Sequence, residues 1–188
     1  MSFDIKRATQ IKALHTEFSE PASCYLNIRK QVQKRGGRTA FGWLKTDVIF
    51  WERPKIQTWI HHCVWESPEG KLFELTPFVQ KVIDDSIIAT LSDTSIFIPD
   101  DDAQLIKHPD GRFQSLTPQY TAIVNSEEAE KGIECMKAAD KKLRQGDVRG
   151  EAYWCERASQ VLGGWIQPLG ELGVKTMTPF TLDDDEGN

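Results

Sequence analysis

Cysteine, histidine and glutamate follow one another in the first half of the chain at positions where they could act on one substrate. Cys24 lies near the start of a predicted helix, and two histidines, His61 and His62, lie in a predicted strand. Glu74 lies in the strand that follows. A thiolate attacks a carbonyl carbon, an imidazole takes and returns the proton, and a carboxylate holds the imidazole in one orientation. This order of residue types therefore indicates nucleophilic chemistry at a thiol.

The helix start would favour the thiolate form of Cys24, because unpaired amides and the helix dipole lower the pKa of a thiol. The amide N–H of Cys24 can also donate to the oxyanion that forms on attack. Asn27 lies one turn further along the same side and is a second candidate donor. A cysteine in a helix can also be a small buried apolar residue, so its position alone leaves both interpretations open.

Neighbouring residues of a strand point to opposite faces, so at most one of His61 and His62 can face the thiol. Both faces of this strand are largely apolar, and alternation therefore does not decide between them. Cys63 shares a face with His61 and is a rival nucleophile. It lacks a helix N-terminus beside it, and we expect it to be a core residue.

Glu74 shares a face of its strand with Leu72 and Thr76. A carboxylate in such surroundings is costly to bury without a partner, and it would fit as the acceptor for the second N–H of an imidazole. The alternative is a solvated glutamate that faces an edge of the sheet.

The elements that must position these residues follow from periodicity and breakers. Residues 4–18 show helical spacing, and a second helix is predicted from Pro21 to about residue 34, where Gly36 and Gly37 end it. Strands are then predicted at 39–44, 48–51, 56–66, 71–76, 87–91 and 95–99. Helical spacing returns from about residue 127, with a turn at 145–147 and a second helix over 151–162. We expect an α+β domain over 1–125, a C-terminal helical extension packed on it over 126–182, and an acidic disordered tail over 183–188.

The composition is that of an ordinary globular protein: 188 residues, 39% hydrophobic and 27% charged. A net charge of -5 argues against a nucleic-acid partner. No secretory signal and no membrane-spanning apolar run are recognisable, and the four cysteines have no scaffold-like spacing. We therefore expect a cytoplasmic protein with free thiols and no membrane partner. Secretion without a signal peptide would leave no trace in the sequence, and the oligomeric state leaves none either.

Other chemistries lack their patterns. Zinc sites use about four ligands in close pairs, and the histidines and cysteines of this chain show no such pairing. Neither a Gly-x-Ser-x-Gly motif nor a phosphate-binding glycine loop occurs. We expect no metal and no cofactor.

Between residues 20 and 100 the chain resembles the transglutaminase-like, papain-fold cysteine enzymes. In that superfamily a cysteine begins a helix that ends at glycine, and a Gly-aromatic strand, a histidine strand and an Asp-x-Thr strand follow. The pattern of an uncharacterised bacterial branch is also matched, in Cys24-x-x-Asn27, Gly42-Trp43, Trp51-Glu-Arg-Pro54, His62-Cys-Val-Trp65 and Glu74-Leu-Thr-Pro77. Glu74 departs from the usual aspartate, which keeps the charge and changes the reach.

The resemblance implies an α+β fold with a papain/transglutaminase-like core, in which a helix packs on an antiparallel sheet and a C-terminal helical pair follows. It also selects His62 over His61. The implied function is a cysteine hydrolase, deamidase or transamidase acting on a protein or peptide. Its site would hold Cys24, His62 and Glu74 as a triad, with Asn27, Trp43 and His61 around the oxyanion or substrate. The alternative is a non-catalytic protein-interaction domain whose C-terminal aromatic residues, Tyr153, Trp154 and Trp165, form a partner surface.

Overall fold

The structure is a computed structural model that describes residues 3–21, 23–46, 55–81, 87–90, 93–164 and 166. The protein is α+β, as the sequence predicts. Its described residues divide into two compact units. The first unit contains those up to Leu44 and from His61 to Gln104, and the second contains those from Lys45 to Ile60 and from Leu105 onward. These limits differ from the expected boundary at residue 125.

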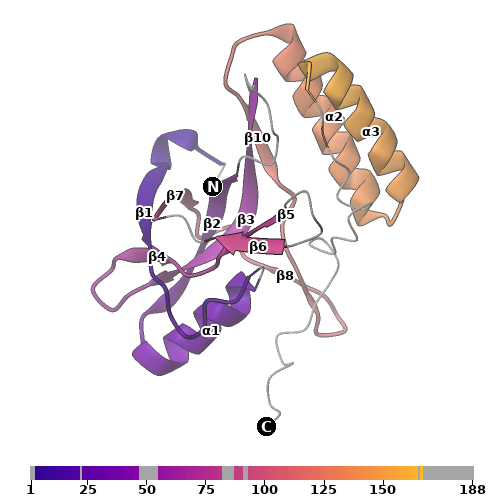
Figure 1. Ribbon diagram of the computed structural model, residues 1–188. Coiled ribbons are helices and arrows are strands. Elements are labelled where there is room, and N and C mark those ends of the chain that lie inside the picture. Colours follow the sequence, from indigo (N-terminus) through magenta and orange to yellow (C-terminus); the bar gives the residue numbers. More distant parts are fainter. Residues whose placement is uncertain are drawn as a thin grey trace. The chain divides into compact units, whose positions relative to one another are not determined.

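Five strands of the main sheet close into a ring (Figure 1). In order around the ring they are β3 (Ile56–Glu66), β2 (Arg38–Thr46), β7 (Thr94–Pro99), β1 (Thr9–Ala13) and β4 (Leu72–Glu74), and β4 pairs again with β3. β1 and β4 run parallel, whereas β7 is antiparallel to both of its neighbours. The expected antiparallel sheet is thus corrected to a closed sheet with one parallel pair.

The helix predicted over 4–18 is wrong. A short 3-10 helix, η1 (Ile5–Arg7), is capped by the Asp4 side chain, which accepts from the Lys6 amide at 3.0 Å. β1 then pairs on both sides, with β7 and with β4. Two ladders of backbone hydrogen bonds outweigh a local helical preference worth only tenths of a kcal/mol per residue.

One helix, α1 (Cys24–Arg35), belongs to the first unit. It ends where the sequence predicts, because Gly36 takes a φ of 71° and donates its N–H to the Val32 carbonyl at 2.9 Å. The inner side of α1 packs Ile28 against a cluster that contains Cys63, Trp65 and Leu75.

The register of the strands shows which face α1 covers. Trp65 lies opposite Phe73, and both pack with the cluster under α1. Glu74 lies opposite Ala13 on the other face, which also carries Ile11. In β3 only Trp65 and Glu66 pair with β4. His62 therefore lies in a part of β3 that is not paired with β4.

The second unit holds the predicted helical pair, α2 (Glu127–Arg144) and α3 (Val148–Leu162). Ser126 and Asp147 cap the two helices, each accepting from a backbone N–H of the first turn. Small residues let the helices approach closely: a Cβ on Gly132 would lie 2.4 Å from Leu162. Within this unit β10 (Gln119–Ala122) pairs with the first half of β3.

Two small hairpins complete the fold, β5–β6 (Phe78–Lys81 and Ile87–Thr90) and β8–β9 (Ile106–Lys107 and Phe113–Gln114). The predicted strand at 48–51, the Trp51–Pro54 motif, Trp165 and the acidic tail at 183–188 lie outside the described residues. In the described ranges, no helix combines the length and the apolar character needed to cross a membrane.

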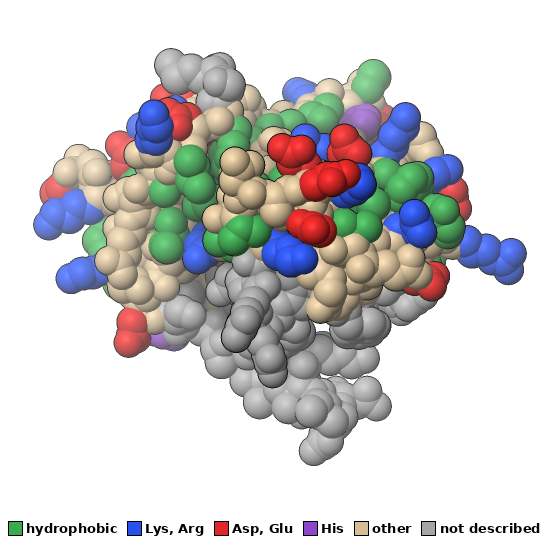
Figure 2. All heavy atoms as spheres, turned by 90° about the horizontal axis from the view of Figure 1, so that it is seen from above, with side chains coloured by type: hydrophobic (Ala, Val, Ile, Leu, Met, Phe, Trp, Pro, Cys, Tyr) green, Lys and Arg blue, Asp and Glu red, His purple; other side chains and the backbone are tan. Residues whose placement is uncertain are grey.

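Two basic residues near α1 are paired with acidic side chains. Arg38 contacts Glu66 at 2.6 Å, and Lys34 contacts Glu17. Acidic and basic side chains are also interspersed over the face of the molecule shown in Figure 2.

Candidate active site

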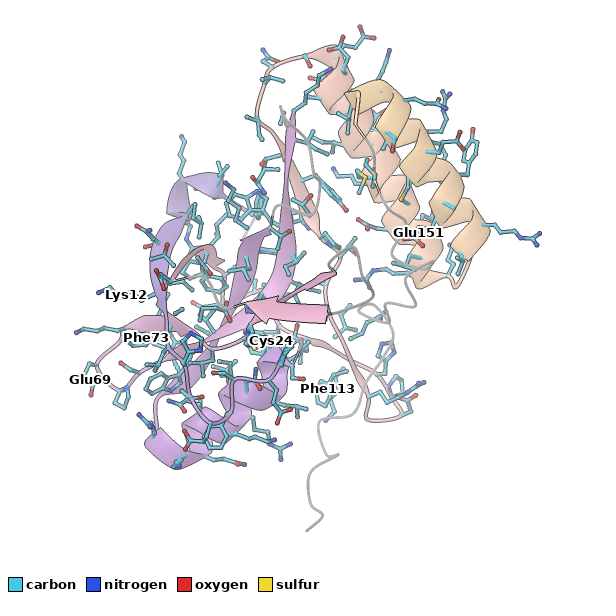
Figure 3. All side chains as sticks on the ribbon, in the orientation of Figure 1. Lys12, Cys24, Glu69, Phe73, Phe113 and Glu151 are labelled. Carbon is cyan, nitrogen blue, oxygen red and sulfur yellow. The ribbon has the colours of Figure 1, made fainter. Side chains whose placement is uncertain are left out.

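Cys24 is the first residue of α1 (Figure 3). It is partly exposed. The Cys63 thiol donates a hydrogen bond to its sulfur, and the His62 ring supplies a nearby charge and a further hydrogen bond. These contacts outweigh the effect of burial and lower the pKa of the Cys24 thiol well below its ordinary value. The amide N–H of Cys24 has no acceptor within the helix, because it is the first helical residue.

His62 is buried and lies between Cys24 and a carboxylate. Its Nε2 atom is 2.8 Å from Oε2 of Glu74, and the carboxylate accepts, so Nε2 carries the hydrogen and Nδ1 is left for the sulfur. Burial opposes a charge on the ring, but the charges of Glu74 and Cys24 prevail and raise the pKa of His62 well above its ordinary value. The geometry therefore favours a thiolate–imidazolium pair.

Glu74 is fully buried at the end of β4, and both of its oxygens have partners. Oε2 accepts from His62, and Oε1 accepts from the Thr76 backbone N–H at 2.7 Å. A carboxylate held from both sides orients the imidazole that it contacts.

Asn27 connects the turn before Cys24 to the strand that carries Glu74. Its Nδ2 atom donates to the Glu20 carbonyl at 2.7 Å and to Oγ1 of Thr76 at 3.1 Å. Its Oδ1 atom accepts from the Glu20 N–H at 3.3 Å. Both amide hydrogens are used, so none is left for the oxyanion role that the sequence led us to expect. These bonds instead tie Asn27 to the turn before α1 and to Thr76.

The two other candidates from the sequence, His61 and Trp43, also have partners inside the protein. Nε2 of His61 donates to the Ala103 carbonyl at 2.7 Å, and the Tyr25 hydroxyl lies 3.0 Å from Nδ1. Trp43 is 4% exposed and donates from Nε1 to Asp100 at 3.0 Å. The structure therefore brings His62 and Glu74 to Cys24 but offers a substrate no polar atom of His61 or Trp43.

Cys63 is the residue at this site that sequence reasoning missed. It is fully buried, as expected of a core residue, yet its thiol contacts Cys24. Burial, followed by the contact with Cys24, raises the pKa of Cys63, so this thiol keeps its proton. One signal in the sequence bears on this contact. Cys24 and Ile28 lie one turn apart on the same side of α1, so a strand residue that packs on Ile28, as Cys63 does, can also reach Cys24.

In the described ranges, no three of the His, Cys, Asp and Glu side chains are grouped so as to hold a metal ion. Comparison of the chain with protein-family models, curated proteins and solved structures finds no match.

Proposed function

We propose that this protein is a cysteine-dependent enzyme that acts on acyl or amide carbonyl groups of a protein or peptide. The observation that carries this proposal is that His62 contacts Cys24 on one side and Glu74 on the other. A helix-start sulfur with a lowered pKa meets an imidazole with a raised pKa, and a buried carboxylate fixes the far side of the ring. Perturbed groups in mutual contact, one of them partly exposed, are typical of catalytic sites.

In the proposed reaction the Cys24 thiolate attacks the carbonyl carbon, and the electron pair of the C=O bond moves to oxygen. The Cys24 N–H donates to this oxyanion. When the tetrahedral species collapses, the C–N bond breaks and His62 gives its proton to the departing amine. An acceptor then attacks the thioester, His62 takes the acceptor's proton, and the thiolate is released.

The acceptor decides the outcome. Water gives hydrolysis, or deamidation when the carbonyl belongs to a side-chain amide, and an amine gives transamidation. All three share the thioester at Cys24, and trapping that thioester is therefore the common test.

The competing proposal from the sequence is a protein-interaction domain. Of its aromatic residues, Trp154 packs on the core between α2 and α3, whereas Tyr153 is 55% exposed. Among the aromatic residues of this surface that the structure describes, one exposed ring makes a small docking surface. The buried charges around His62 favour the enzyme, because an interaction surface on the helices does not need them.

The test is the rate of Cys24 alkylation by iodoacetamide between pH 5 and 10, read by peptide mass spectrometry on the full chain. We expect the rate to persist well below the pKa of a free thiol, about 8.5. In His62→Ala that advantage should be lost, and cleavage of an activated ester through an acyl adduct on Cys24 should fall by on the order of 100-fold or more.

Cys135 is an internal control in the same digest, since burial raises the pKa of its thiol and no imidazole is among the causes of that shift. Cys24→Ser shows whether the acyl adduct forms elsewhere. An ordinary alkylation profile for Cys24, unchanged by His62→Ala, would rule out the enzyme and favour the interaction domain.

A further inference from the structure

The first unit contains a second sulfur at the proposed nucleophile that forms no covalent bond in the acyl chemistry. Cys63 of β3 donates its thiol hydrogen to the Cys24 sulfur. Both side chains also pack in the apolar cluster around Ile28. Two side chains far apart in the chain are thereby in contact at the start of α1.

The two thiols differ in how solvent can reach them. Cys24 is partly exposed, whereas Cys63 is 0% exposed. A reagent from solution therefore reaches Cys24 before Cys63. Cys63 is shielded from the reagent but contacts Cys24, so it can react with the modified Cys24 sulfur.

The two thiols also differ in protonation state, and this difference again makes Cys24 the one that reacts first. Contact with Cys63 and His62 favours the thiolate at Cys24, and burial favours the neutral thiol at Cys63. A thiolate reacts with peroxides, and a neighbouring thiol can then condense with the oxidised sulfur.

We propose that Cys24 and Cys63 form a redox centre, in which a hydroperoxide oxidises Cys24 and Cys63 closes the disulfide. The Cys24 sulfur attacks the terminal oxygen of the hydroperoxide, the O–O bond breaks, and the alkoxide leaves with a proton as the alcohol. The Cys63 sulfur then attacks the sulfenic sulfur, the S–O bond breaks, and hydroxide leaves with the Cys63 proton as water. The two sulfurs lose two electrons, which the peroxide gains.

The disulfide would have two consequences for the site. It removes the Cys24 sulfur from acyl chemistry until a dithiol reduces it. It also withdraws Cys24 from further oxidation to the sulfinic acid, which thiols do not reverse.

The test treats the reduced full chain with one equivalent of hydrogen peroxide, blocks remaining thiols with iodoacetamide and maps the peptides without reduction. We expect a crosslinked pair of peptides that contain Cys24 and Cys63, and its complete loss after dithiothreitol. In Cys63→Ala we expect loss of the crosslink and accumulation of dimedone-reactive or sulfinic Cys24.

Cys63→Ser, with a polar group nearer in size to the thiol, repeats the test in case the alanine variant folds poorly, and circular dichroism checks both. Cys135→Ala is the matched control and should still give the crosslink. A wild-type chain in which Cys24 becomes sulfinic without the crosslink would overturn the proposal.

This proposal is independent of acyl transfer, and the two fail differently. His62→Ala should slow acyl-adduct formation by on the order of 100-fold or more, while the crosslink still forms at a reduced rate. Loss of the crosslink in Cys63→Ala with a normal wild-type acyl adduct bears only on the redox centre.

Discussion

Glu74 is the residue whose charge organises the proposed site, because it is fully buried and touches the imidazole directly. Its charge raises the pKa of His62. The hydrogen bond with Cys63 and, after it, the charge on His62 lower the pKa of Cys24. The carboxylate therefore acts on the sulfur through the ring between them.

Replacing Glu74 by glutamine keeps an acceptor for the His62 N–H and removes the charge. The pKa of His62 should fall, less imidazolium should be present near neutral pH, and alkylation of Cys24 at pH 6 should slow about tenfold, the effect of one pKa unit. Glu74→Asp keeps the charge and changes the reach, so a smaller loss there assigns the effect to charge. An unchanged rate in Glu74→Gln would show that the carboxylate does not act on the thiol.

At the scale of elements, the site depends on how α1 is attached to the strand that carries Glu74. Asn27 of α1 bonds to Glu20 before the helix and to Thr76 after β4. Thr76 in turn donates its N–H to Glu74. Together with the contact of Glu74 to His62, these hydrogen bonds form a network that connects Asn27 to the residues around Cys24.

Asn27→Ala removes the side-chain hydrogen bonds of Asn27 from this network. Loss of the buried bonds should lower the free energy of unfolding by about 1–3 kcal/mol and slow Cys24 alkylation at pH 6. Thr76→Val removes only one of the bonds and should have a smaller effect on both. Urea unfolding and alkylation rates measured on the single and double variants give the coupling, and an alanine variant that loses stability but not reactivity would contradict a positioning role.

The helical pair carries a buried carboxyl group that makes stability depend on pH. Burial raises the pKa of Asp140 to about 7, against the opposing effects of the hydrogen bond from Tyr120 and the charge of Arg144. The folded state therefore holds a proton that the unfolded chain releases near pH 4. The stabilisation is complete below about pH 4 and is lost as the pH rises through about 7.

Asp140→Asn should remove this dependence while keeping an acceptor for Tyr120, which bonds to Asp140 at 2.7 Å. Between pH 4 and 8 we expect the contribution of this residue to the wild-type unfolding free energy to fall by at most about 4 kcal/mol. Melting temperatures at a series of pH values check the slope. A slope that survives in the asparagine variant would have to come from other groups.

At the scale of the molecule, each unit can be perturbed by itself. Cys24, Cys63, His62 and Glu74 all lie in the first unit, although two separate parts of the chain supply them. The second unit has its own apolar core between α2 and α3, which includes Ala129, Ala158 and Leu162. Damage to that core should lower stability and leave the electrostatics of Cys24 unchanged.

Gly132→Ala is suited to this test, because its Cβ would lie 2.4 Å from a buried Leu162. Overpacking of about 1–3 kcal/mol should exceed the gain of about 1 kcal/mol in helix propensity, so the melting temperature should fall. Adding Leu162→Ala should relieve the clash and leave its own cavity cost. A changed pH profile of Cys24 alkylation in Gly132→Ala would show that the units are not independent at the site.

Sequence by itself determined the elements whose signals are local. The helix from Cys24 ends at a glycine with positive φ, and β3 spans the predicted residues Ile56–Glu66. Breakers and periodicity act over a few residues and can be recognised without the rest of the fold. The order of thiol, imidazole and carboxylate was visible for the same reason.

Only the tertiary structure decided what depends on distant partners. Residues 9–13 became a strand because β7 and β4 lie on either side of them. Asn27 is held by Glu20 and Thr76. Cys63 and His62 are neighbours in β3, and both contact Cys24. Strand alternation places these two neighbours on opposite faces, and a helix start beside the end of the β3–β4 ladder can meet both. That geometry comes from closing the sheet, which no local pattern encodes.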